Sequence, residues 1–132
     1  MGGRGAFDSN MGRTGGIPVE NRIYSQIGKI DKIKIIQCDT KPNNPTITYS
    51  NTANTTYYSY SKENNRIEHI YYYRDHKLFK SVDFEKGVAA HVHYWNGSIV
   101  GRKRHDKHNI HALSDKDKRL MNKALKWNRD HE

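Results

Sequence analysis

The chain has 132 residues, enough for one domain with a modest hydrophobic core and too few for two. Its single cysteine, Cys38, excludes an internal disulfide and a cysteine-rich zinc knuckle. The sequence has no apolar run near the roughly 20 residues of a membrane span and no hydrophobic signal-peptide core. The net charge of +9 favours polyanions or acidic protein surfaces as partners.

The first sixteen residues are rich in glycine and contain almost nothing that a core could bury. Glycine loses more backbone entropy on ordering than any other residue, and little apolar burial is available here to offset that loss. We therefore expect residues 1–16 to form a flexible tail and residues 17–132 to form a single domain.

The middle of the chain consists of short segments rich in Ile, Thr and Tyr, separated by residues that favour turns. This pattern predicts an antiparallel meander. The expected strands are Ile30–Cys38, Thr46–Tyr49, Thr55–Ser61, Arg66–Arg74, Leu78–Phe84 and Ala90–Trp95.

Six tyrosines in these strands allow two interpretations. They can form an exposed platform on which nucleic-acid bases stack, or they can fill a half-buried sheet, where tyrosine is a common residue. The composition favours the second. The tyrosines are Tyr57, Tyr58, Tyr60, Tyr71, Tyr72 and Tyr73.

A helix is predicted from Ser114 to about Trp127. Ser114 is a good N-cap residue, and Asp117 stands at the third helical position, close to a capping box. The apolar residues that follow recur at helical spacing, which favours packing of one helix face on the sheet. The predicted fold class is therefore α+β, a small antiparallel sheet with a C-terminal helix packed on it.

Five of the eight histidines lie between residues 91 and 111. His91 and His93 are two apart in a β-type segment, so a strand would point both rings to one face. His105, His108 and His111 recur every three residues. Imidazole nitrogens and a carboxylate oxygen are suitable ligands for zinc, so the two groups together predict a zinc site.

The register of the last predicted hairpin supplies the carboxylate. If Val82 pairs with Val92 on the apolar face, Asp83 lies beside His91 and His93 on the other face. A histidine from the following loop would complete a closed, structural site, and His108 is the first choice among the three. The predicted zinc ligands are Asp83, His91, His93 and His108.

One alternative to this assignment remains open, and two further histidines are left out of it. The clustered histidines can instead be polar surface residues of a basic chain. His69 and His76 are interpreted as ordinary strand or turn residues and not as ligands.

Four segments resemble small proteins from phages and prophages of Gram-positive bacteria. They are Met1 to Gly5, Val82-Asp83, His91-Val-His93, and Leu113 to Lys118 at the helix start. The similarity covers most of residues 30–127. The genes of that group often lie beside, or are fused to, phage head-morphogenesis genes, and small phage proteins of this type include metal-binding inhibitors of CRISPR–Cas9. The resemblance implies a phage or prophage protein in the bacterial host cytoplasm, with a Cas9-type effector as its partner.

Three functions compete at this stage. The first is a non-enzymatic, zinc-stabilised inhibitor of a Cas9-type defence effector, with possible contact to nucleic acid. The second is a metal-dependent nuclease or toxin domain, and the third is a nucleic-acid-binding accessory protein of phage head morphogenesis. Four protein ligands close a zinc site and three leave it open for catalysis, so the four predicted ligands favour the inhibitor. The basic residues expected to contact the partner are Arg102, Lys103 and Arg104.

Overall fold

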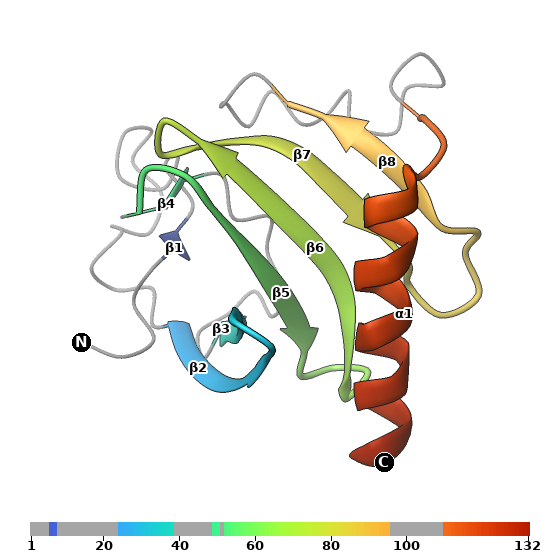
Figure 1. Cartoon of the computed structure of the whole chain (residues 1–132). Coiled ribbons are helices and arrows are strands. Elements are labelled where there is room, and N and C mark those ends of the chain that lie inside the picture. The colour runs from blue at the N-terminus through green and yellow to red at the C-terminus, as the bar shows by residue number, and fades with distance from the viewer. Residues whose placement is uncertain (1–5, 8–23, 39–48, 51, 96–109) are drawn as a thin grey trace.

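The computed structural model of the chain describes residues 6–7, 24–38, 49–50, 52–95 and 110–132. These residues form one β-sheet and one C-terminal helix, which lies along one face of the sheet (Figure 1). The predicted α+β class is confirmed. No helix within the described residues is long and apolar enough to cross a bilayer.

The described residues contain eight strands, of which two have only two residues each. Their order across the sheet is β1-β4-β7-β6-β5-β3-β2, and β8 also pairs with β7. The strands are β1 (Ala6–Phe7), β2 (Tyr24–Ile30), β3 (Ile33–Cys38), β4 (Tyr49–Ser50), β5 (Thr55–Ser61), β6 (Arg66–Arg74), β7 (Lys77–Asp83) and β8 (His91–Tyr94).

The meander prediction holds for β5 to β8, which pair antiparallel in sequence order. It is wrong for β3 and β5, which are parallel neighbours with Ile35 opposite Tyr58. Between them the chain forms β4 at the far side of the sheet, where Tyr49 pairs with Lys77 of β7. Two adjacent strands that run in the same direction require such a crossover, and strand composition alone does not indicate it.

Strand boundaries also differ from the prediction outside β5 and β6, and the bounds of β7 and β8 differ from those predicted by one residue at each end. The segment predicted as one strand, Ile30–Cys38, contains the end of β2 and all of β3, separated by a turn in which Asp31 adopts a φ of 55°. Of the predicted strand Thr46–Tyr49, only Tyr49 lies among the described residues. In the predicted tail, Ala6 and Phe7 form β1 and pair with β4, and the rest of residues 1–16 lies outside the described part.

Helix α1 spans Asp115–Asp130, and its predicted start is confirmed. The backbone N–H of Asp117 donates to Ser114 Oγ at 3.1 Å, and the backbone N–H of Ser114 donates to Asp117 Oδ2 at 2.9 Å. This reciprocal pair is a complete capping box, which satisfies backbone donors that a helix start otherwise leaves unpaired. The helix continues three residues past the predicted end at Trp127.

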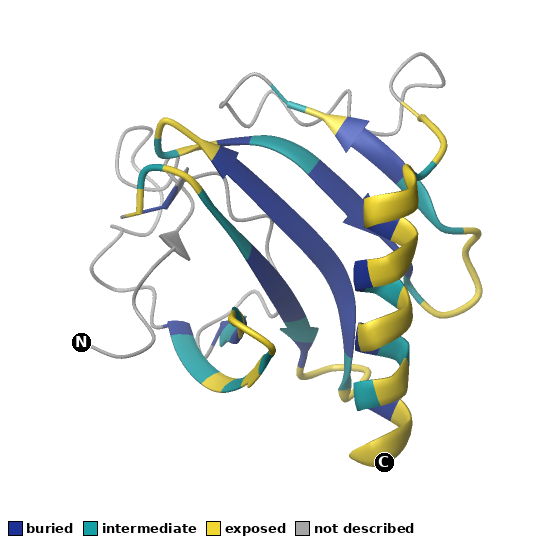
Figure 2. Cartoon of the chain, in the orientation of Figure 1, coloured by how far each residue is buried: buried dark blue, intermediate teal, exposed yellow. Residues whose placement is uncertain are grey.

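The apolar face of α1 packs against the sheet, and Figure 2 shows its buried residues turned toward the strands. Polar contacts reinforce this packing. The side chain of Asn128 pairs with both backbone groups of Ile67, at 2.8 and 3.0 Å, and the Tyr58 hydroxyl donates to the Leu120 carbonyl at 2.8 Å. Burial, with a smaller contribution from the charge of Asp31, raises the pKa of Tyr58 to about 12, so its hydroxyl keeps its proton.

The tyrosines belong to the two hydrophobic clusters on opposite faces of the sheet. Five of the six are at most 6% exposed, and only Tyr60 is half-buried. Bases cannot stack on rings that are covered by protein, so the platform interpretation is excluded and the sheet-filling one is confirmed.

Candidate metal centre

The predicted register of the last hairpin is confirmed. The observed pairs are Ser81 with His93, Val82 with Val92, and Asp83 with His91. The two valines belong to the core beneath α1. Because side chains alternate along a strand, the aspartate and the two histidines lie together on the opposite face.

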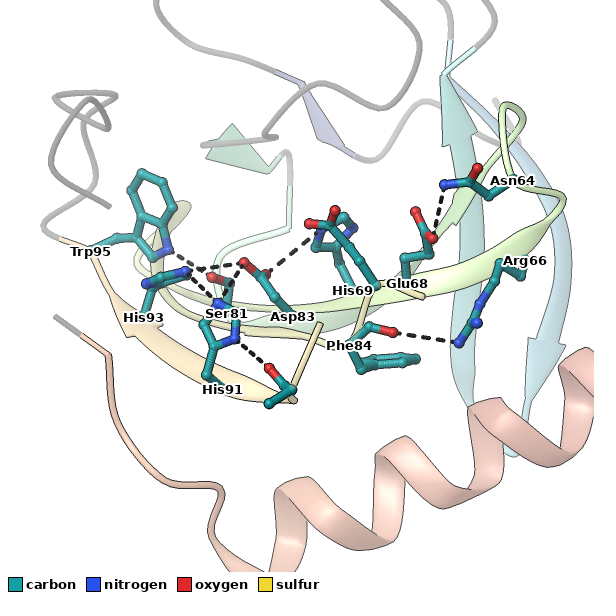
Figure 3. Close-up of polar contacts among 12 residues, drawn as sticks. Asn64, Arg66, Glu68, His69, Ser81, Asp83, Phe84, His91, His93 and Trp95 are labelled. Atoms are coloured by element: carbon teal, nitrogen blue, oxygen red, sulfur yellow. Dashed lines mark hydrogen bonds and ion pairs between the residues drawn. The ribbon is translucent and has the colours of Figure 1, made fainter. Parts of the chain in front are cut away.

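The polar atoms of Asp83, His91 and His93 converge on one point (Figure 3). His93 Nε2 lies 3.1 Å from Asp83 Oδ2, and His91 Nε2 lies 3.6 Å from the same oxygen. The two Nε2 atoms are 3.1 Å apart. Ligand atoms about 2.0 Å from a tetrahedral zinc ion are separated by about 3.3 Å, so all three distances are close to those of an occupied site.

Neighbouring groups orient the ligands. His91 Nδ1 lies 2.7 Å from the carbonyl oxygen of Ala89, which can only accept, so Nδ1 carries the proton and Nε2 presents its lone pair to the cluster. The His93 side chain has no exposed area. Trp95 lies at the edge of the same cluster (Figure 3) and donates from Nε1 to Ser81 Oγ at 2.9 Å. The His91 ring is therefore held in the orientation that metal binding requires.

Asp83 is ionised in this environment. Burial acts to raise its pKa, but the hydrogen bond from His93 and the positive charge that the neighbouring histidines carry when protonated outweigh burial, and its pKa lies below the ordinary value. A carboxylate must lose its proton to bind a metal ion, so Asp83 is ready to act as a ligand at neutral pH.

A second group of ligand atoms lies on the other side of Asp83. His69 of β6 is the cross-strand partner of Asp83. Its Nε2 lies 3.7 Å from Asp83 Oδ1 and 3.3 Å from Glu85 Oε1. The predicted strand position of His69 is confirmed, but these contacts were not predicted. The observed pairing of Ile70 with Val82 places His69 beside Asp83, and this register of β6 against β7 was not predicted from the sequence.

The fourth predicted ligand, His108, lies outside the described residues, as do His105 and the predicted partner-binding residues Arg102, Lys103 and Arg104. His111 is described and does not join the cluster. Its backbone exchanges two hydrogen bonds of 2.9 Å with Val92, and its ring contacts Tyr94. Residues paired in this way share a face, so the His111 ring lies on the side of Val92, away from Asp83.

Comparison of the chain with protein-family models, curated proteins and solved structures finds no match.

Proposed function

We propose that this chain is a zinc-binding protein that acts on a macromolecular partner by binding it, with one zinc ion held by Asp83, His91 and His93 and with His108, which lies outside the described residues, as the fourth ligand that closes the site. One observation carries the proposal. The three ligand atoms are separated by 3.1 to 3.6 Å, close to the edge of about 3.3 Å in a tetrahedral zinc site.

The burial of this cluster supports a structural role for the ion. The side chains of His93, Asp83 and His91 are 0%, 9% and 13% exposed. An ion at this position would tie β7 to β8 on the face that α1 does not cover. A structural metal contributes binding free energy directly to folding, which suits a sheet with a low overall hydrophobic content.

The partner follows from the resemblance described above and from charge. Small phage proteins of this type include metal-binding inhibitors of CRISPR–Cas9, which act in the bacterial host cytoplasm, so a Cas9-type effector is the partner to test first. A chain of net charge +9 is attracted to acidic protein surfaces and to nucleic-acid backbones, which speeds encounter with a nucleoprotein complex.

A specific observation favours a second candidate, a metal-dependent nuclease. The side chain of Glu85 is 44% exposed and lies 3.3 Å from His69 at the edge of the cluster. A solvent-accessible carboxylate next to a metal-bound water can accept a proton from it. A zinc ion with three protein ligands keeps one position for that water.

Metal content tests the zinc site. Native protein analysed for first-row metals should carry tightly bound zinc, and His93→Ala should lose it. His131→Ala is the matched control, because His131 is exposed and stacks on Trp127 at the end of α1. The site is refuted if native protein carries no metal or if His93→Ala and His131→Ala retain equal amounts.

A cleavage assay separates the two functions. Guide-loaded Cas9 is incubated with target DNA, with and without the protein, beside a lane that holds only nucleic acid and the protein. Weaker cleavage of the target by Cas9 when the protein is present supports the binding function. Metal-dependent degradation of nucleic acid in the lane without Cas9 supports the nuclease. Reversal of Arg102, Lys103 and Arg104 to Glu should weaken inhibition without loss of bound zinc, because these residues are expected at the partner and not at the metal.

A further inference from the structure

The carboxylate of Asp83 faces two different groups of ligand atoms. Oδ2 is directed to His91 and His93, at 3.6 and 3.1 Å. Oδ1 is directed to His69, at 3.7 Å. Figure 3 shows Asp83 between the pair of histidines on β8 and His69 on β6. A carboxylate whose two oxygens meet separate sets of ligands has the arrangement of a group that bridges two metal ions.

We propose that the cluster holds two divalent cations side by side, with Asp83 bridging them and with His69 and Glu85 binding the second ion. This inference rests on the proposed function, because the first ion is the zinc held by Asp83, His91 and His93.

Two distances at the second position are close to those at the first. His69 Nε2 lies 3.3 Å from Glu85 Oε1, and the ligand atoms of His69, Asp83 and Glu85 all lie within 4.8 Å of one another. The His69 ring stacks on Tyr71 with a centroid separation of 5.6 Å and an angle of 10°, which fixes the plane of the ring. Three ligands of the types that bind zinc or manganese therefore converge on a second point.

The electrostatics favour a cation at both points. Within the described residues, every ion pair of Asp83 is formed with a histidine, and none with a lysine or arginine. Two metal ions bridged in this way are typically about 3.5 to 4 Å apart, and their mutual repulsion is reduced by the bridging carboxylate and by Glu85. Without a second ion, His69 would instead hold a proton on Nε2 and donate it to the carboxylates, which is the competing arrangement.

The two positions differ in exposure. The first is enclosed by side chains that are at most 13% exposed. The second includes Glu85, whose side chain is 44% exposed. Solvent can reach the second ion and supply its remaining ligands, so we expect this ion to exchange faster and to bind more weakly than the first.

The test counts metal ions in the full chain. Protein stripped with a chelator is titrated with Zn²⁺ by calorimetry, and the product is checked by elemental analysis. We expect two ions per chain in the unaltered protein and in the His131→Ala control. We expect one ion in Glu85→Gln and in His69→Ala, with the tighter binding event retained. Glu85→Gln keeps the test decisive if His69→Ala fails to fold, because Glu85 is partly exposed and its substitution removes no core packing.

A second readout reports the distance between the ions. Protein loaded with two equivalents of Mn²⁺ should give the electron paramagnetic resonance spectrum of an exchange-coupled pair, and Glu85→Gln should give that of an isolated ion. One ion in the unaltered protein would overturn the bridged pair and leave the single zinc site standing. No ion would overturn both. Two ions that persist in Glu85→Gln and His69→Ala would place the second ion elsewhere and also overturn the inference.

Discussion

Asp83 and Asp117 are both buried, but their neighbours differ in kind. Asp117 accepts from Lys80 Nζ at 2.8 Å and from the Tyr72 hydroxyl at 2.7 Å. Asp83 is surrounded by three histidine rings. Lysine carries a fixed charge at neutral pH, whereas an imidazole is charged only when protonated and otherwise offers a lone pair to a metal. The comparison shows that burial alone does not mark a binding site, and that the identity of the neighbours does.

Strand β7 supplies both environments through its alternation. Lys80 points to the face covered by α1 and meets Asp117 at the helix start. Asp83, three residues later, points to the opposite face. Among the described residues, the buried carboxylate on the helix side pairs with a lysine, and the one on the other side pairs with histidines.

Removal of metal should have the largest effect. Addition of a strong chelator is expected to lower the free energy of unfolding by at least about 4 kcal/mol, the linkage value for a ligand present at a thousand times its dissociation constant. Urea unfolding with and without chelator measures this drop in the free energy of unfolding. In His93→Ala the chelator should change little, and an equal response in both proteins would place the stabilising metal away from Asp83.

Loss of Asp117 should have the next largest effect. Asp117→Ala removes the capping box and leaves Lys80, whose side chain is 16% exposed, without its carboxylate. We expect a loss of about 3 kcal/mol in urea unfolding. The exposed Asp115 in the same helical turn is the matched control, and Asp115→Ala should cost less than about 1 kcal/mol. Equal losses of stability in Asp117→Ala and Asp115→Ala would show that the buried contacts of Asp117 contribute nothing beyond those of an exposed aspartate in the same turn.

Acid should remove part of the Asp117 contribution. Burial raises the pKa of Asp117, but the hydrogen bonds from Lys80 and Ser114 outweigh burial and hold the pKa below its ordinary value. A depressed pKa in the folded state gives stability that is complete above the unfolded pKa of about 4 and is lost as pH falls through the folded value. The stability difference between unaltered protein and Asp117→Asn should therefore narrow below about pH 4. Metal release in acid affects both proteins, so the difference between them isolates the contribution of Asp117. A stability difference that does not change with pH would show that the pKa of Asp117 is not lowered in the folded protein.

The smallest effect is expected at an exposed ion pair. Lys123 of α1 pairs with Asp31 of the β2–β3 turn, and their side chains are 44% and 66% exposed. Solvent screens such a pair, so Lys123→Ala should change the unfolding free energy by less than about 1 kcal/mol. A loss as large as that of Asp117→Ala would show that burial does not explain how much each of the two ion pairs contributes to stability.

Local features were predictable because they depend on residues close together in the chain. The capping box involves Ser114 and Asp117, three residues apart. The bounds of β5 and β6 match their predicted segments, and the β7–β8 register followed from alternation within one hairpin. That register was sufficient to bring Asp83, His91 and His93 together.

Contacts between distant segments were decided by the tertiary structure. The sequence contains Lys80 and His69 but does not show that β7 brings Lys80 to the helix start, or that β6 brings His69 to Asp83. It also groups His111 with the other histidines, although its pairing with Val92 turns the ring to the opposite face. Strand segments of similar composition can pair in several orders, and packing of the whole sheet against α1 selects one of them. The sequence alone therefore determined the hairpin that holds three ligand atoms, and only the assembled sheet added His69 and Glu85 to them.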